Sequence, residues 1–108
     1  MGNIGTTFGG QTFGDVDYVN ASIPVIASAN TISPVDNTLR ITGNTTIKTI
    51  NLPCPGFTGI MWIYNTDAST GTWDTTGNIA LAGTFTRFKL FGFMYDAGVS
   101  KWYPASTA

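Results

Sequence analysis

Two short segments of this chain carry large apolar residues at consecutive positions instead of alternating them with polar ones. They read GIMWIYN at 59–65 and FKLFGFMY at 88–95. Successive side chains of a β-strand point to opposite faces, so such strands need cover on both sides. A small two-sheet domain leaves the outer face of each sheet in water. The two segments therefore predict strands at the centre of a sheet or at an interface between subunits.

The remaining composition also favours strands over helices. The chain of 108 residues has no His and no Glu, and only 10% of its residues are charged. Thr, Val, Ile, Gly, Asn and aromatic residues abound, a mixture with low helix propensity that suits strands and turns. We expect one all-β domain, a small antiparallel sandwich or barrel-like module that occupies residues 18–108.

Further strands are expected, in chain order, at 18–28, 38–52, 78–96 and 101–103, with a turn at 97–100. Pro24 lacks a backbone N–H and limits its strand to a sheet edge. Gly43 and Asn44 interrupt the second of these segments with a turn or bulge. Its apolar residues change parity near Thr49, which predicts a change of register there.

Residues 1–17 differ from the rest and are expected to form an extended, glycine-rich arm. Glycine occurs five times within the first 14 residues, and so dense a run loses too much backbone entropy to fold alone. Ile4, Phe8 and Phe13 are spaced like anchors along an extended segment. Either the segment is a disordered start, or it is an arm that becomes ordered only against a partner.

Aromatic residues of the expected strands exceed what one thin core needs. Exposed, they would form an apolar patch of the size that marks an interface, and association would bury it. We therefore assign to the core or to an interface between subunits Trp62, Tyr64, Phe91, Phe93, Trp102 and Tyr103.

Four motifs between Thr38 and Pro104 resemble a β-rich module of tailed-phage structural proteins. They are ITGNTTIKTI (41–50), PGFTG (55–59), GNIALAGTFT (77–86) and FMYDAGVSKWYP (93–104). Members of this group commonly have a tighter Tyr-Asp-Gly-Ser-Lys-Trp turn, which Ala97 and Val99 lengthen here. The module is found in head decoration proteins, head fibres, tail fibres and tailspikes.

The resemblance implies a homotrimer on a virion and carries no catalytic residues. The expected function is that of a capsid decoration (cement) protein, which binds the major capsid protein on the outer surface of the head after synthesis in the host cytoplasm. The grip would come from the arm residues Ile4, Phe8 and Phe13. The alternative is a head or tail fibre component that binds a host receptor. No stalk-forming repeat is present in the sequence to support that alternative.

Catalytic, metal and nucleic-acid sites are not expected, and no cofactor is implied. Without His or Glu, acid–base and nucleophilic chemistry has almost no candidates. Asp15 and Asp17 lack the spacing of a calcium loop, and Asp67 and Asp74 fit turn roles better than a glycosidase pair. The five Lys and Arg residues are scattered, which disfavours a phosphate-binding face. No apolar run approaches the ~20 residues that span a bilayer.

Two single residues complete the predictions. Cys54 lies between Pro53 and Pro55 and is interpreted as a small apolar filler of a rigid turn. Trp73 lies in a polar stretch, where it either plugs a loop from inside or stacks on a sugar from outside. The sequence leaves this alternative open.

Overall fold

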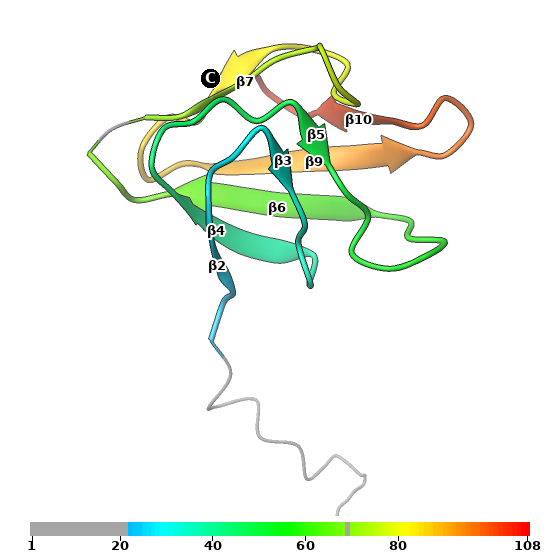
Figure 1. Ribbon diagram of the computed structural model, residues 1–108, viewed down its shortest axis with the longest axis horizontal. Helices are drawn as coiled ribbons and strands as arrows, with labels where there is room; N and C mark the ends of the chain where they lie inside the picture. The colour runs from blue at the N-terminus through cyan, green and yellow to red at the C-terminus, as the bar shows by residue number, and fades with distance from the viewer. Residues whose placement is uncertain (1–21, 69) are drawn as a thin grey trace, which may run out of the picture.

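The structure, a computed structural model, describes residues 22–68 and 70–108, and these contain strands and turns but no helix. The strands are short, and Figure 1 shows them in three groups. In chain order they are β2 (Val25–Ala27), β3 (Thr31–Ile32), β4 (Thr38–Thr42), β5 (Thr49–Ile50), β6 (Ile60–Asn65), β7 (Thr72–Trp73), β8 (Gly83–Thr84), β9 (Leu90–Asp96) and β10 (Lys101–Pro104). The prediction of an all-β fold is confirmed for this part of the chain.

The largest sheet has five strands in the order β10-β9-β6-β4-β2. Its pairs β10·β9 and β9·β6 are antiparallel, whereas β6·β4 and β4·β2 are parallel. The sheet is therefore mixed, and the expected purely antiparallel arrangement is wrong. The parallel pairs arise because the chain, after each of the strands β2 and β4, returns along the strand direction before it begins the next strand of this sheet. Among the strands of the described residues the sheet does not close on itself, and β10 and β2 lie at its edges.

The segment 59–65 does form the central strand, as its sequence predicts. Met61, Ile63 and Asn65 of β6 point into the core, and the residues between them lie on the opposite face. Pro24 precedes the edge strand β2, also as expected. Its carbonyl accepts a hydrogen bond from the Arg40 amide at 2.9 Å, so the proline contributes an acceptor to the pairing with β4 although it has no N–H to donate.

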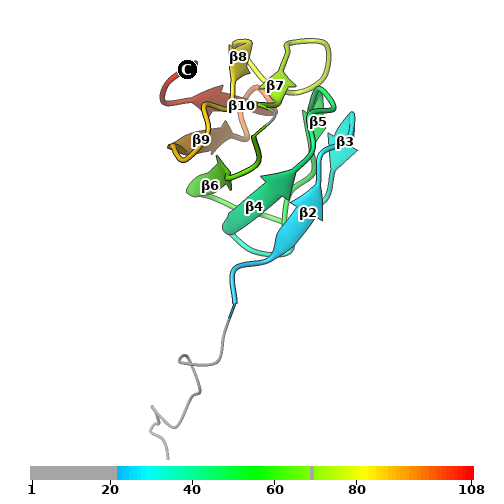
Figure 2. The same cartoon turned by 90° about the vertical axis from the view of Figure 1, so that its left-hand side faces the viewer.

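Two two-stranded sheets, β3·β5 and β7·β8, cover one face of the large sheet. Figure 2 shows both on the same side of it. The parity change near Thr49 has its origin here, because the chain leaves the large sheet after β4 and enters the small parallel sheet at β5. Two layers with a core between them result, and this agrees with the sandwich-like part of the expectation.

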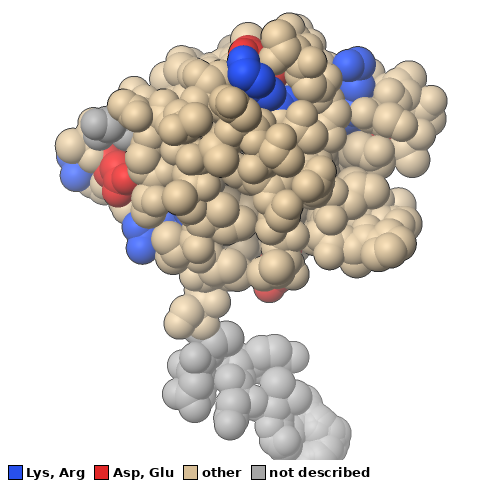
Figure 3. Space-filling model, in the orientation of Figure 1, with Lys and Arg blue, Asp and Glu red and all other residues tan. Residues whose placement is uncertain are grey.

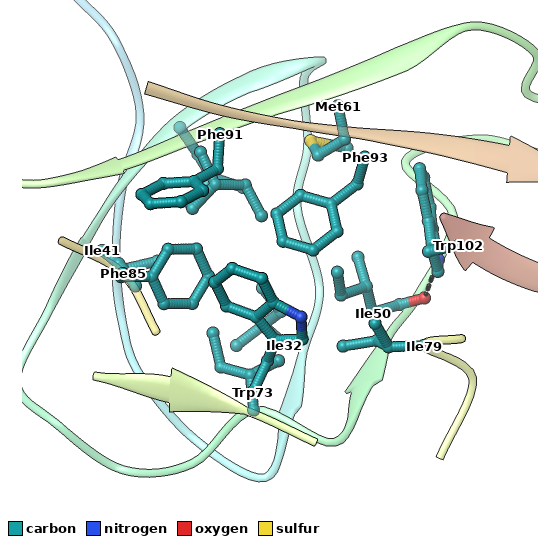
Figure 4. Packing of buried hydrophobic residues seen from close by; sticks show 13 residues of the cluster. Ile32, Ile41, Ile50, Met61, Trp73, Ile79, Phe85, Phe91, Phe93 and Trp102 are labelled. Atoms are coloured by element: carbon teal, nitrogen blue, oxygen red, sulfur yellow. Dashed lines mark hydrogen bonds between the residues drawn. The ribbon is translucent and has the colours of Figure 1, made fainter. Parts of the chain in front are cut away.

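The core between the layers is rich in aromatic rings. The Trp73 ring lies 4.5 Å from that of Phe85 and 5.4 and 5.0 Å from those of Phe91 and Phe93, centroid to centroid. Its indole N–H donates to the Leu81 carbonyl at 2.7 Å, so the polar atom of this buried side chain is satisfied. Figure 4 shows these rings facing one another. Trp73 therefore plugs the molecule from inside, and its placement excludes stacking on an external sugar.

A second aromatic group lies around Trp102 on β10. Its ring contacts those of Tyr95 and Phe57, at centroid distances of 5.0 and 5.8 Å. The indole N–H donates to the Ile50 carbonyl at 2.9 Å, the dashed line in Figure 4. This bond joins the last strand of the large sheet to the small sheet β3·β5, so it ties the two layers together.

Candidate functional site

The acidic residues weighed as a catalytic pair have structural roles in the described part of the chain. Asp67 accepts a hydrogen bond from the Gly43 amide at 2.7 Å and so holds the turn after β4. Asp74 accepts from the Thr76 hydroxyl at 2.6 Å and from the Thr76 amide at 3.0 Å. These are the turn roles that the sequence favours. Asp15 and Asp17 lie outside the described residues.

The Asp74 carboxylate also forms an ion pair with Lys48 Nζ at 2.9 Å. The two Thr76 hydrogen bonds, followed by that of Lys48, lower the pKa of Asp74 from 3.8 to about 2. Each of these contacts stabilises the charged form, which is the opposite of what a general acid requires. The cluster therefore pins the loop at 74–76 to the chain before β5.

The feature that calls for a functional explanation is the outer face, by which we mean the face of the five-stranded sheet turned away from the core. Its centre consists of apolar and aromatic side chains. Those with large exposed area are Ile60, Trp62, Leu90, Met94 and Tyr103, and they come from β6, β9 and β10. Val25 extends the face onto β2, where it pairs with Arg40 across the ladder.

A groove crosses the outer face where β6, β9 and β10 meet. It encloses about 350 Å³ and is lined by Ile60, Trp62, Gly92, Met94, Tyr103, Pro104 and Ala105. Gly92 is itself buried, because the Trp62 ring covers the place where a side chain would lie. A Cβ atom there would lie 2.8 Å from Cζ3 of Trp62 and 3.2 Å from Cγ2 of Ile60. The glycine thus allows the Trp62 ring to lie across β9.

Charged residues of the outer face lie around its margin. Arg40 on β4 donates to the Thr66 hydroxyl at 3.3 Å. At the opposite end, Lys101 faces Asp96 across the β9·β10 pair. An apolar centre with a polar rim is the usual anatomy of a protein–protein interface.

The opposite side of the molecule, visible in Figure 3, likewise carries few charged side chains, which lie mostly near its outline.

The aromatic residues assigned by sequence to a core or an interface separate into these two groups. Phe91, Phe93 and Trp102 are buried in the core, with at most 1% of each exposed. Trp62 and Tyr103 lie on the outer face, where 36% and 39% of their surface is exposed. Tyr64 also belongs to the outer face by its position in β6 and is half-buried. The three proposed arm residues, Ile4, Phe8 and Phe13, lie outside the described residues.

Sequence reasoning missed several residues of the outer face. Ile60, Leu90 and Met94 were not singled out, although they share the parity of Trp62 within their paired strands. Gly92 was also missed, and an isolated glycine inside an aromatic strand was the available signal. Cys54 was interpreted wrongly, because its thiol is exposed and fills no space.

Within residues 22–68 and 70–108, no group of three or more His, Cys, Asp or Glu residues comes together in a way that could hold a metal ion. The same part of the chain contains no helix able to cross a membrane.

Comparisons with known proteins give the fold a distant counterpart but no family. No protein-family model matches the chain, and no curated protein matches it. Among solved structures, a chain from a structure of a chaperone–substrate complex superposes with a TM-score of 0.50 at 12% sequence identity. The match covers 75% of this chain and 16% of that one, so this protein spans less than a fifth of the length of its structural neighbour. At this identity the likeness concerns the fold alone.

Proposed function

We propose that the protein is a structural component of a virion, a capsid decoration protein that assembles as a homotrimer on the outer surface of a phage head. The observation that carries the self-assembly is the apolar outer face of the five-stranded sheet. The attribution to a phage head rests on the motif resemblance between Thr38 and Pro104.

The extent of the outer face supports an assembly role. The exposed fractions of Val25, Ile60, Trp62, Leu90, Met94 and Tyr103 lie between 36% and 53%. With roughly 150–250 Å² for a whole large side chain, they expose on the order of 400–700 Å² together. The largest apolar patch of a typical monomer is about 300–600 Å² and is often functional. With its polar rim, the face approaches the ~800 Å² that each partner contributes to a stable interface.

A trimer suits a decoration protein because several weak contacts then act together. Each subunit would bring one arm with the anchors Ile4, Phe8 and Phe13 to the major capsid protein. Three tethered arms raise the effective concentration of each, and the avidity gain can reach about 10²–10⁴. The outer face would then hold the subunits together, and the arms would hold the trimer to the shell.

Two experiments test the proposal. Sedimentation equilibrium should give a species of three times 11.5 kDa, and a monodisperse monomer at micromolar concentration would refute the self-assembly. Electron microscopy of intact particles should place the density of the protein on the outer surface of the head. Density at a fibre or tail tip would instead support the receptor-binding alternative.

A further inference from the structure

The groove on the outer face is shaped for one apolar side chain. Its lining includes Gly92, the Trp62 ring that lies across this glycine, Met94 and Tyr103. No charged residue lines it, and the polar partners that orient a sugar or a small polar ligand are nearly absent. At about 350 Å³, it has room for a phenylalanine ring and part of the backbone that carries it. Its occupant should therefore be an aromatic or aliphatic anchor on an extended peptide.

The chain itself contains such a peptide in residues 1–21, which lie outside the described part. Phe13 is followed directly by Gly14, and Gln11 and Thr12 separate it from the pair Gly9 and Gly10. A glycine next to the ring lets the backbone approach a sheet closely enough for the ring to enter a groove. Eight residues lie between Phe13 and Ser22, where the described chain begins, and the nine extended steps from Phe13 to Ser22 reach about 30 Å.

Reach alone would allow Phe13 to occupy the groove of its own subunit. The chain enters the sheet at β2, and the groove lies toward the opposite edge, four strand spacings or about 19 Å away at β10. In that arrangement the connecting residues Asp15 and Asp17 would pass over the apolar centre of the face. Carboxylates there would lose water without gaining a partner.

Approach from a second subunit avoids this cost. A peptide that enters the groove over β10 keeps its aspartates at the rim, near Lys101. Among the described residues Lys101 forms no ion pair, since the one ion pair there joins Lys48 and Asp74. The carboxylate that faces Lys101 across the ladder, that of Asp96, accepts a hydrogen bond from the Gly98 amide at 2.8 Å, and the Lys101 ammonium group can pair with Asp15 or Asp17. We propose that Phe13 of one subunit docks in the Gly92–Trp62 groove of a second copy, so that the arms link neighbouring subunits.

This inference rests on the proposed self-assembly and divides the arm into two parts. Phe13 would bind a neighbouring subunit instead of the capsid, so that Ile4 and Phe8 remain of the three anchors proposed above for the capsid contact. The arms would then connect the subunits in a ring, and each groove would be filled by a neighbour.

Disulfide trapping with the full-length chain tests the proposal. In a Cys54→Ser background, one tagged chain carries Phe13→Cys and a second, differently tagged chain carries Met94→Cys. After co-expression and mild oxidation, we expect a disulfide-linked pair of the two differently tagged chains. Docking would hold the two cysteines close together and so raise their effective concentration. The yield of the linked pair should then be about 10²-fold above that of two cysteines that meet only by diffusion.

The matched control replaces Met94→Cys by Val35→Cys, a site that is 78% exposed and lies outside the groove. Equal yields from the two pairs would overturn the proposal. A chain that carries both Phe13→Cys and Met94→Cys gives a second readout, because links within one chain would place the arm on its own subunit and would also overturn it. Sedimentation of the Cys54→Ser parent distinguishes a failure of the Phe13 docking from a failure of the self-assembly. A trimer without the Phe13 link refutes only the docking, whereas a monomer refutes the proposed assembly itself.

Discussion

Trp62 and Gly92 are direct partners across the β6·β9 ladder, and the ring of the first occupies the space where the second has no side chain. A tryptophan that lies across a cross-strand glycine presents a wide, flat apolar surface. A Cβ atom at Gly92 would lie only 2.8 Å from the ring, so the shape of the outer face depends on this pair.

Gly92→Ala should alter assembly more than folding. Trp62 is partly exposed and can swing away from the new methyl group, and alanine in a strand regains about 0.5–1 kcal/mol of the entropy cost of glycine. We expect the free energy of unfolding to change by less than about 1 kcal/mol. The subunits should associate more weakly because the ring no longer lies flat, as measured by sedimentation velocity. Unchanged association would show that the outer face is not the subunit interface.

Gly83→Ala offers a contrasting case, because the same substitution meets a tryptophan that cannot move. A Cβ atom there would lie 2.2 Å from Cζ2 of Trp73, whose ring is enclosed by Phe85, Phe91 and Phe93. Overpacking of this kind costs roughly 1–3 kcal/mol and sometimes more. Chemical denaturation should reveal the loss. Gly71→Ala is a suitable control, since its Cβ would meet its neighbours at ordinary distances of 3.7–3.8 Å.

Trp102→Ala should destabilise the fold strongly. The side chain is fully buried, and its removal leaves a cavity between the two layers, at a cost of roughly 3–5 kcal/mol. Trp102→Phe should cost less, because the Ile50 carbonyl keeps its hydrogen bond from the side-chain Nδ2 of Asn78 at 2.8 Å. Urea denaturation measures both variants. If Trp102→Ala leaves the unfolding midpoint unchanged, the placement of this ring in the core is wrong.

Acid should weaken the loop that Asp74 holds. The folded-state pKa of Asp74, about 2, lies below its ordinary value of 3.8, so this carboxylate stabilises the fold above pH 3.8. The contribution is lost as the pH falls from 3.8 to about 2, where the folded state also takes up the proton. Asp74→Asn should flatten the pH dependence of stability in this window. Thr76→Val should raise the pKa of Asp74 in an NMR titration, and a failure to do so would contradict the assigned cause.

The sequence predicted the elements of this fold better than their arrangement. Consecutive apolar residues at 59–65 and 88–95 predicted central strands, because a strand covered on both sides shows no alternation. The parallel pairs of β4 could not be predicted, since short strands carry no signal for their direction. For the same reason, the parity change near Thr49 suggested a register shift within one strand, whereas the chain in fact changes sheets.

The candidate site was predictable only in part. The aromatic content of the strands predicted interface positions for Trp62 and Tyr103. It predicted them equally for Phe91, Phe93 and Trp102, which are buried in the core. Trp102 and Tyr103 are consecutive residues of β10 and point to opposite faces, so the division depends on which face the small sheets cover. That depends on long-range pairing, which no local pattern in the chain encodes.

The central position of β6 has a consequence for the order in which the protein can form. One neighbour, β4, precedes it in the chain, but the other, β9, ends only at Asp96, and β10 with the core residue Trp102 follows. During synthesis β6 would therefore emerge with one side unpaired and its apolar faces bare until β9 has also left the ribosome. Pairings between distant segments also form slowly. A protein built in this way depends on prompt synthesis of the segment from β6 to β10, and its yield in the cell should fall when translation stalls between residues 65 and 90.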